Sequence, residues 1–304
     1  MVKNKILITG ANGFLGSHCV EKFAEKGNEI FTVGRKCVKN AKIRSAVDGE
    51  INLENLRKLE NIGFDIIIHC GGSGNVGYSL QNPFDDFNNS VNSTISVLEF
   101  ARNFSPNSLI IYPSTPAVQG LHDDSPIKES DPSMPVSPYG VHKKLAEELC
   151  LSYSHNFGIK TAIIRFFSIY GEGLKKQLIW DACNKMYKSE NSEIEFWGNG
   201  EETRDWIYID DAIDLIKILC KSKIDKSFIV NGGSGIRYTI CETLSALAES
   251  FNFSGKIKFN QFQKAGDPKY YLADTTITNL VGWKPKFSLQ KGIENYVKWF
   301  KECI

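Results

Sequence analysis

The first half of the chain alternates short, continuously apolar runs with longer stretches in which apolar residues recur every three or four positions. The short runs predict strands over residues 6–9, 30–33, 65–69, 108–112 and 160–165. The longer stretches predict helices over residues 15–26, 85–104 and 138–156. Strands that are apolar on both faces and separated by helices are typical of a parallel sheet covered on both sides. We therefore expect a doubly wound α/β fold whose ligands lie beyond the carboxyl ends of the strands.

The pattern becomes irregular after about residue 167. Paired glycines interrupt it near residues 171–173 and 198–200, and strand-like or helical pieces return near 205–220 and 228–231. We expect a second, smaller α/β domain built from discontinuous segments. Its expected boundaries are about 168–204 and 233–304, which leaves residues 1–167 and about 205–232 to the larger domain.

Composition and charge narrow the class of protein. The chain has 304 residues, 42% of them hydrophobic and 23% charged, which is enough material for two packed domains. Lys and Arg (36) nearly balance Asp and Glu (35), so neither nucleic acid nor a membrane surface is an expected partner. No apolar run approaches the ~20 residues that span a bilayer. The first five residues lead directly into a strand, which predicts no secretory signal peptide.

The number and spacing of the cysteines indicate the cellular compartment and whether a structural metal site is expected. There are 8, scattered along the chain without a CxxC pair or a Cys/His cluster. This spacing predicts free thiols and no structural metal site, as in a reducing, cytoplasmic compartment.

A glycine-rich loop joins the first predicted strand to the first predicted helix. Gly10, Gly13 and Gly16 follow a GxxGxxG spacing. In this spacing the first glycine permits a tight turn, the second lets the backbone approach a pyrophosphate, and the third lets helix and strand pack closely. The helix N-terminus adds free N–H groups and a partial positive charge. Between a strand and a helix, the loop predicts a dinucleotide phosphate site.

The end of the second predicted strand bears on which dinucleotide is bound. NAD sites usually carry Asp or Glu there, which accepts a hydrogen bond from the ribose 2′-hydroxyl. This chain has Gly34, Arg35 and Lys36 instead. Because a guanidinium can hold a 2′-phosphate bidentately, the sequence favours NADP(H), with NAD(H) as the alternative.

Tyr139 and Lys143 form a YxxxK pair at the start of a predicted helix. The i, i+4 spacing places both on one face. A neighbouring ammonium favours a phenolate, so we expect Lys143 to lower the pKa of Tyr139 from ~10 toward working pH. Tyr139 would then act as a general acid and base.

Further motifs follow along the chain: residues 113–120 read PSTPAVQG, 163–171 IIRFFSIYG, 203–207 TRDWI, 273–275 ADT and 282–285 GWKP. Together with the glycine loop and the Tyr139–Lys143 pair, they resemble the extended short-chain dehydrogenase/reductase family of NAD(P)-dependent nucleotide-sugar epimerases, dehydratases and reductases. The resemblance covers essentially the whole chain. It implies that the larger domain is a dinucleotide-binding Rossmann domain and that the smaller one binds the nucleotide sugar.

The resemblance also implies roles by position. Thr115 would hydrogen-bond the reacting sugar oxygen, Tyr139 would exchange its proton, and Lys143 would hold the nicotinamide ribose and tune Tyr139. The residues expected at the cofactor are Gly10, Asn12, Gly13, Phe14, Leu15, Gly16, Arg35, Lys36, Ile51, Cys70, Gly71, Gly72, Ser90, Tyr139, Lys143 and Phe166. The residues expected at the nucleotide-diphosphate sugar are Ser73, Thr115, Ser168, Gln177, Arg204 and Lys264. Arg204 and Lys264 would hold the diphosphate, while Ser90 and Ser168 replace an Asn that is usual in relatives.

The residues after Thr115 narrow the reaction. The 4,6-dehydratases of this family follow the catalytic Thr with Asp and Glu, which remove water, whereas this chain has Pro116 and Ala117. Dehydration is therefore not expected. Since Arg35 favours NADPH, we expect NADPH-dependent reduction of a 4-keto nucleotide-linked 6-deoxy sugar, with hydride transfer to C4.

Two alternatives stay open. The first is an NAD-dependent nucleotide-sugar 4-epimerase of the UDP-glucose/galactose type. The second is a cofactor-sensing regulatory protein on the same fold, which the intact Thr115, Tyr139 and Lys143 disfavour.

The last expectations concern the positions of two histidines and the assembly of the protein. We expect His69 to be packed in the core and His142 to face away from the site. The resemblance implies a homodimer joined by a four-helix bundle, to which each subunit contributes the helices near residues 86–104 and 138–156.

Overall fold

The computed structural model describes residues 3–36, 41–190, 192–222, 226–262 and 268–304. The chain divides into two compact units. The first unit comprises residues 1–120, 131–165 and 213–230, and the second comprises 121–130, 166–212 and 231–304. Two boundaries differ from those expected from the sequence. The segment that returns to the first unit begins at 213 instead of about 205, and residues 121–130 join the second unit.

Pairing explains both differences. Strand β9 (Thr203–Tyr208) lies in a sheet with β7 (Ser168–Tyr170) and β11 (Arg237–Thr239), all within the second unit. Ile127, in the segment 121–130, forms a bridge with Ala273 of the same unit. Backbone pairing of this kind joins segments that are far apart in sequence, so the apolar pattern alone does not reveal it.

A seven-stranded sheet forms the centre of the first unit, in the order β10–β6–β5–β4–β1–β2–β3. The strands are β1 (Lys5–Thr9), β2 (Glu29–Gly34), β3 (Ile43–Asp48), β4 (Ile66–His69), β5 (Leu109–Ser114), β6 (Lys160–Phe166) and β10 (Phe228–Gly232). Neighbours from β6 to β3 run parallel. The strand order reverses between β1 and β4, and this confirms the predicted doubly wound Rossmann fold.

Strand β3 is the one strand of this sheet that the apolar pattern did not predict. It lies at the edge, and its residues alternate between half-buried and exposed. An edge strand buries only part of its surface, so it lacks the continuous apolar run of the central strands.

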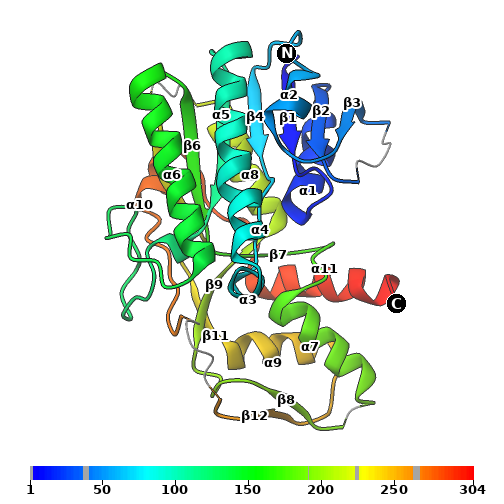
Figure 1. Ribbon diagram of the computed structural model, residues 1–304. Helices are drawn as coiled ribbons and strands as arrows, with labels where there is room; N and C mark the ends of the chain where they lie inside the picture. The colour runs from blue at the N-terminus through cyan, green and yellow to red at the C-terminus, as the bar shows by residue number, and fades with distance from the viewer. Residues whose placement is uncertain (1–2, 37–40, 191, 223–225, 263–267) are drawn as a thin grey trace. The chain divides into compact units, whose positions relative to one another are not determined.

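Helices flank the sheet of the first unit. They are α1 (Phe14–Ala24), α2 (Leu53–Arg57), α3 (Val76–Gln81), α4 (Pro83–Phe87), α5 (Ser93–Phe104), α6 (Pro138–Phe157) and most of α8 (Ile209–Leu219). The helix predicted over 85–104 is α4 and α5 joined by a π-helical turn, Asn88–Asn92. Figure 1 shows α5 and α6 side by side along the front of the sheet. Their apolar faces, including Val97, Phe100 and Ala146, pack on the buried strand residues and form the core of this unit.

A buried ion pair ties α6 to β6. The guanidinium of Arg165 donates from Nε to Oε1 of Glu147 at 3.1 Å and from a terminal nitrogen to Oε2 at 2.8 Å. The Ser114 hydroxyl, at the end of β5, donates to the same carboxylate at 2.5 Å. Both ionic side chains are buried. The pair therefore fixes α6, which carries the Tyr139–Lys143 motif, against the ends of two strands.

The second unit contains two small sheets and four helices among the residues that the structure describes. Besides β7, β9 and β11, its elements are α7 (Gln177–Lys188), β8 (Ile194–Phe196), α9 (Ile240–Phe251), β12 (Ile257–Phe259), α10 (Thr276–Leu280) and α11 (Leu289–Glu302). The buried carboxylate of Asp205 joins three of its segments. It accepts hydrogen bonds from the backbone N–H groups of Ser234 (2.6 Å), Gly235 (2.9 Å) and Ala273 (3.0 Å).

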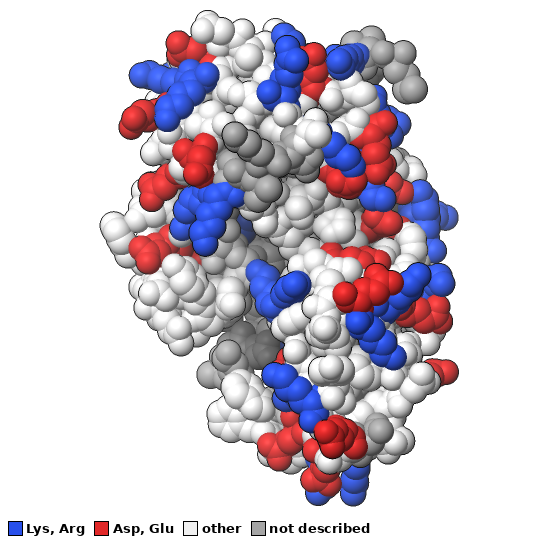
Figure 2. Space-filling view, turned by 90° about the vertical axis from the view of Figure 1, so that its right-hand side faces the viewer, with Lys and Arg blue, Asp and Glu red and all other residues white. Residues whose placement is uncertain are grey.

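The surface carries both signs of charge. Figure 2 shows Lys and Arg side chains interspersed with Asp and Glu over the face in view. The mixture of charges on this face agrees with the near-zero net charge of the chain. Among the helices of the described ranges, none has the length and apolar character required to cross a bilayer.

The Glu147–Arg165 pair leads to a stability prediction. Glu147→Gln should lower the free energy of unfolding by about 3 kcal/mol, because it leaves the buried guanidinium without its counter-charge. Urea denaturation followed by circular dichroism measures this change. Glu148→Gln is the matched control, since Glu148 is exposed on the same helix; it should change the free energy by less than about 0.5 kcal/mol. Equal effects of the two substitutions would contradict the structural role of the pair.

Candidate active site

The glycine loop is packed so closely that side chains are excluded from it. Gly10 has φ +65°, and a Cβ there would lie 2.7 Å from the backbone nitrogen of Gly71. A Cβ on Gly16 would lie 2.3 Å from the carbonyl oxygen of Gly10. The loop turns tightly through a hydrogen bond from Gly13 N to Gly10 O (2.9 Å), and Gly13 precedes the first residue of α1. The chain thus forms a side-chain-free cradle at a helix N-terminus, which fits a dinucleotide pyrophosphate.

The turn after β2 is held by the glycine loop. Asn12 donates from Nδ2 to the carbonyl oxygen of Arg35 at 2.9 Å and also to that of Lys36. The side chains of Arg35 and Lys36 are both exposed. Asn12 therefore fixes the backbone next to the cradle while the two cationic side chains extend into solvent.

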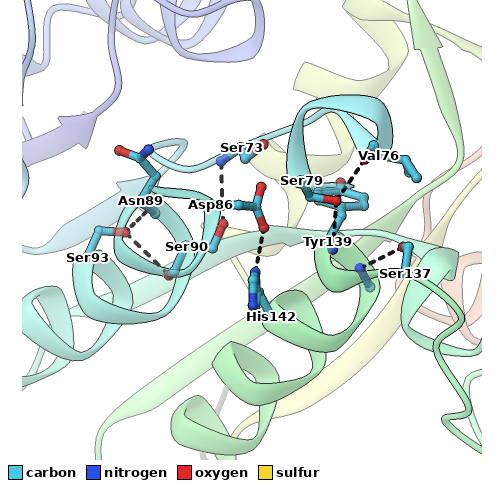
Figure 3. Close-up of polar contacts among 11 residues, drawn as sticks. Ser73, Val76, Ser79, Asp86, Asn89, Ser90, Ser93, Ser137, Tyr139 and His142 are labelled. Carbon is cyan, nitrogen blue, oxygen red and sulfur yellow. Dashed lines mark hydrogen bonds and ion pairs between the residues drawn. The ribbon is translucent and has the colours of Figure 1, made fainter. Parts of the chain in front are cut away.

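The backbone that follows β4, at Gly71 and Gly72, lies beside the cradle and forms what we call the floor of the site. A Cβ on Gly71 would lie 2.1 Å from Cδ1 of Ile51, so the end of the Ile51 side chain packs directly on this glycine. The backbone N–H of Ser73 donates to the hydroxyl of Ser90 at 3.4 Å (Figure 3). A Cβ on Gly72 would lie 3.8 Å from both Nζ of Lys143 and the Ser90 hydroxyl oxygen. The predicted cofactor residues Ile51, Gly71, Gly72 and Ser90 therefore lie around one floor, and Lys143 reaches it.

Helix α6 presents Tyr139 at its first turn. Ser137 caps the helix by accepting from Gly140 N at 3.2 Å, and Pro138 occupies the first helical position, where a missing N–H has no cost. The backbone N–H of Tyr139 donates to the hydroxyl of Ser79 at 3.1 Å, and that hydroxyl donates to the carbonyl oxygen of Val76 at 2.8 Å (Figure 3). Helix α3 therefore fixes the backbone position of Tyr139, a role of Ser79 that no sequence motif indicated.

The ionisation of Tyr139 differs from the sequence-based expectation. Burial raises the pKa of Tyr139 to about 12, while a hydrogen bond with Thr115 acts in the opposite direction. We expected Lys143 to lower this pKa toward working pH, and that expectation is wrong for this structure. Desolvation of the phenolate is the main cause of the rise, and the negative charge of Asp86 adds to it.

Thr115 meets Tyr139 from the end of β5. Its side-chain oxygen accepts from the backbone N–H of Ala117 at 3.2 Å and caps the short 3-10 turn Pro116–Val118. The same side chain hydrogen-bonds the Tyr139 hydroxyl. Two hydroxyl groups from separate elements thus adjoin.

Lys143 is buried one turn after Tyr139. Its Nζ donates to the carbonyl oxygen of Pro113 at 2.9 Å and lies 4.8 Å from the centre of the Tyr112 ring. Burial lowers the pKa of Lys143 to about 8, although the carboxylate of Glu147 acts against the shift. The ammonium is therefore held at the floor of the site by a carbonyl and an aromatic face.

His69 is packed below the site, as expected. Its ring nitrogens lie 2.7 Å from the Thr9 hydroxyl and 3.2 Å from the Thr94 hydroxyl. Burial, and secondly the charge of Lys143, lower the pKa of His69 to about 3. This histidine is therefore neutral at physiological pH and serves the packing of β1, β4 and α5.

His142 belongs to a pair that the sequence analysis missed. Its Nδ1 lies 2.6 Å from Oδ2 of Asp86 in α4, and both side chains are buried (Figure 3). The sequence analysis expected only that His142 faces away from the site. One signal in the sequence could have indicated the pair. Asp86 is an acidic residue at the helical spacing of Asn82 and Ser90, which are half-buried and buried in the structure.

Three of the predicted sugar-binding residues lie in described parts of the second unit. Ser168 starts β7, and Gln177 is the first residue of α7, where it adopts φ +67°. The guanidinium of Arg204 donates to the carbonyl oxygens of Thr203 and Pro268, each at 2.9 Å, and lies 5.8 Å from the centre of the Tyr271 ring. Lys264 falls outside the described residues.

Relatives of known sequence match this chain over nearly its whole length. A putative UDP-glucose 4-epimerase of Methanocaldococcus jannaschii is 31% identical over 97% of this chain and 98% of its own length. A UDP-glucuronate 4-epimerase of Thermodesulfobacterium geofontis is 26% identical over 98% of this chain and 96% of its own.

Solved structures show the same fold. A variant of the UDP-glucuronic acid 4-epimerase of Bacillus cereus, in complex with UDP-4-deoxy-4-fluoro-glucuronic acid and NAD, superposes with a TM-score of 0.90 at 25% identity. It covers 99% of this chain and 100% of its own. The UDP-glucose 4-epimerase of Thermotoga maritima, with UDP-glucose, gives 0.89 at 22% identity, over 98% of this chain and 99% of its own.

Residues 6–232 match the sequence model of the NAD dependent epimerase/dehydratase family. This match confirms the resemblance inferred from the glycine loop and the Tyr139–Lys143 pair. The chain belongs to the NAD dependent epimerase/dehydratase family.

Proposed function

We propose that this protein is an NAD-dependent 4-epimerase of a UDP-linked sugar. The observation that carries the proposal is the meeting of Thr115, Tyr139 and Lys143 next to a floor that continues into the glycine cradle. Pro116 and Ala117, which follow Thr115, offer no acid or base for removing water. Relatives that are named as 4-epimerases support the same reaction.

This proposal reverses the order of the two sequence-based hypotheses. NADPH-dependent reduction of a 4-keto sugar was favoured because Arg35 stands where NAD sites usually carry an acid. The relatives give that reduction no support, and they fit the epimerase alternative better. Solved relatives whose bound cofactor is named contain NAD. We therefore propose NAD(H) and assign the exposed Arg35 no role in a 2′-phosphate site.

The residues of this chain would perform the proton half of the reaction. Bound NAD would supply a reversible hydride acceptor for C4 of the sugar. Tyr139 would remove the proton of the C4 hydroxyl and later return it to the same oxygen. Because the hydride taken from C4 would also return to C4, a full cycle would consume no reductant. Thr115 orients that oxygen, and the ammonium of Lys143 favours the phenolate as it forms.

Each structural unit has a proposed ligand. The first unit would bind the dinucleotide through the cradle and the floor around Gly71 and Gly72. The second would bind the UDP-sugar through Ser168, Gln177, Arg204 and Lys264, with Arg204 as the diphosphate ligand. UDP-glucose and UDP-glucuronate are the sugars to test first, because relatives are named for them. We place the reaction in the cytoplasm.

A homodimer is the proposed assembly. Helices α4, α5 and α6 carry exposed apolar side chains, which are Phe84, Ile95, Val141, Leu145, Leu151 and Phe157. Val141 and Leu145 are four residues apart, so they share one face of α6. An exposed apolar helix face of this kind favours association with a second copy.

The assembly can be tested by light scattering. The wild-type protein should elute from a sizing column with the mass of a dimer, and the double substitution Val141→Glu/Leu145→Glu should give a folded monomer, because it introduces charge into an apolar interface. Leu280→Glu is the control, since Leu280 is 82% exposed in the second unit; it should leave the mass unchanged. A wild-type monomer at micromolar concentration would contradict this assembly.

The reaction and its cofactor make a second prediction. Purified protein should interconvert UDP-glucose and UDP-galactose, or UDP-glucuronate and UDP-galacturonate, with NAD and without added reductant. Product formation is measured by NMR, and the nucleotide released on denaturation by chromatography. NADPH should not be consumed. Oxidation of NADPH that requires a 4-keto-6-deoxy sugar nucleotide, without epimerisation, would restore the reductase hypothesis.

The role of Tyr139 makes a third prediction. Tyr139→Phe should reduce kcat about 10³-fold, because it removes the proton acceptor. NAD affinity and the folded structure should be retained, because the contact of Tyr139 with Ser79 uses its backbone N–H and not its phenol. Calorimetry and circular dichroism measure these two properties. Tyr187→Phe, at an exposed position of the second unit, is the control. A Tyr139→Phe enzyme with normal turnover would contradict the role of Tyr139 as the proton acceptor.

A further inference from the structure

A buried histidine connects the floor of the site to neighbouring elements through hydrogen bonds. His69, the last residue of β4, is 2% exposed. Its Nδ1 lies 2.7 Å from the hydroxyl oxygen of Thr9 at the end of β1, and its Nε2 lies 3.2 Å from the hydroxyl oxygen of Thr94 in α5. Both threonines are buried as well. Apolar side chains could fill the same space without the cost of burying three polar groups, so the hydrogen bonds themselves need an explanation.

The hydroxyl groups beside Nε2 determine which ring nitrogen carries the proton. The Thr94 hydroxyl donates to the carbonyl oxygen of Ser90 at 2.6 Å. The Ser93 hydroxyl donates to the carbonyl oxygen of Asn89, also at 2.6 Å (Figure 3). Because a hydroxyl has a single hydrogen, both oxygens can only accept from Nε2 of His69, which lies 3.2 Å and 3.4 Å away. The proton is therefore on Nε2.

The other side of the ring agrees with this tautomer. A neutral imidazole that carries its proton on Nε2 is an acceptor at Nδ1, and the burial that lowers the pKa of His69 to about 3 keeps the ring neutral. The Thr9 hydroxyl donates to Nδ1, while its oxygen accepts from the backbone N–H of Gly71 at 3.3 Å. The hydrogen bonds thus run in one direction, from the Gly71 N–H through Thr9, His69 and Thr94 to the Ser90 carbonyl.

Both ends of this series of hydrogen bonds lie at the proposed cofactor site. Gly71 belongs to the floor, and Thr9 directly precedes Gly10 of the glycine cradle. Ser90 lies in the π-helical turn, and its own hydroxyl accepts from the backbone N–H of Ser73. A π-helical turn interrupts the regular hydrogen bonds of an α-helix, so bonds from outside the helix are needed to fix its carbonyls. The buried side chains supply such a bond and tie the turn to the floor.

We propose that Thr9, His69 and Thr94 are positioning residues that hold the floor of the cofactor site at a fixed spacing from the π-helical turn, with the ring proton of His69 on Nε2. They act through the backbone of Gly71 and of Ser90 and need no contact with the cofactor itself. A proton on Nδ1 would break the series, because Thr9 would lose its acceptor and Nε2 would have no donor facing it. The inference deepens the proposed function and rests on it in one respect, namely that the first unit binds NAD.

The position of the ring proton can be measured in the protein without cofactor. Two-bond ¹H–¹⁵N correlation spectra of protein labelled with ¹⁵N-histidine distinguish a protonated from an unprotonated ring nitrogen, and His69→Gln identifies the signals of this residue. At neutral pH we expect a single neutral tautomer with the proton on Nε2. A proton on Nδ1, an average of the two tautomers or a doubly protonated ring would overturn the proposal.

Isosteric substitutions test the effect on the cofactor. Thr9→Val and Thr94→Val keep the shape and remove the hydroxyl, so each should raise the Kd for NAD about tenfold in calorimetry. Thr9→Ser and Thr94→Ser keep the hydroxyl and should bind NAD nearly as tightly as the wild type. Serine is smaller than valine, so a loss of packing would harm the Ser variants more than the Val variants. The opposite order therefore separates hydrogen bonding from packing.

Thr161→Val is the matched control for these variants. Thr161 is 0% exposed like Thr9, but it lies in β6, outside the series of hydrogen bonds. Its substitution should leave the Kd for NAD unchanged. Val variants at positions 9 and 94 that bind NAD as tightly as the Thr161→Val protein would overturn the proposal.

A last measurement separates the positioning role from the choice of cofactor. Hydrogen exchange of the Gly71 amide, followed by NMR in the protein without cofactor, should be faster in Thr94→Val than in the wild type, although His69 and Thr9 separate Thr94 from Gly71. If the wild type binds no NAD but this acceleration and the Nε2 proton are seen, the proposed cofactor fails and the positioning role stands. If the exchange rate is unchanged, the positioning role fails whatever the cofactor is.

Discussion

The burial of the Lys143 ammonium is the constraint on which the arrangement of the site depends. A buried cation must be compensated, and here the Pro113 carbonyl, the Tyr112 ring and the nearby Glu147 carboxylate supply that compensation. Pro113 and Tyr112 belong to β5, whereas Glu147 lies one turn further along α6 and is itself held by Arg165 of β6. The requirement to satisfy one charge therefore joins the helix to two strands. Thr115 and Tyr139 adjoin because this junction is fixed.

Burial also sets the protonation states from which the proposed reaction starts. It raises the pKa of Tyr139 and lowers that of Lys143, so that both groups are less readily charged than in water. Neither shift favours a phenolate at neutral pH. Ionisation of Tyr139 would therefore draw on nearby positive charge, which the Lys143 ammonium supplies.

In the second unit a different buried carboxylate, that of Asp205, holds together the segments around the proposed diphosphate ligand. Asp205 accepts three backbone N–H groups from two distant segments, and burial raises its pKa although each hydrogen bond acts against that rise. Asp205 lies next to Arg204 in β9, so the strand that carries the proposed diphosphate ligand is fixed by its neighbour. In the TRDWI motif the acid is thus structural, while the preceding Arg is the candidate for substrate binding.

Local patterns were sufficient for some features and insufficient for others. Continuous apolar runs identified the central strands because those strands are buried on both faces, and the glycine spacing identified the cradle because close backbone packing excludes a Cβ at Gly10 and Gly16. The YxxxK spacing correctly placed Tyr139 and Lys143 on one helical face, because residues four apart in a helix are neighbours. The alternating edge strand β3, the assignment of residues 121–130 to the second unit and the pairing of Asp86 with His142 depend on contacts between distant segments. The ionisation of Tyr139 was predicted in the wrong direction, because desolvation is a property of everything packed around a group and only the tertiary structure determines it.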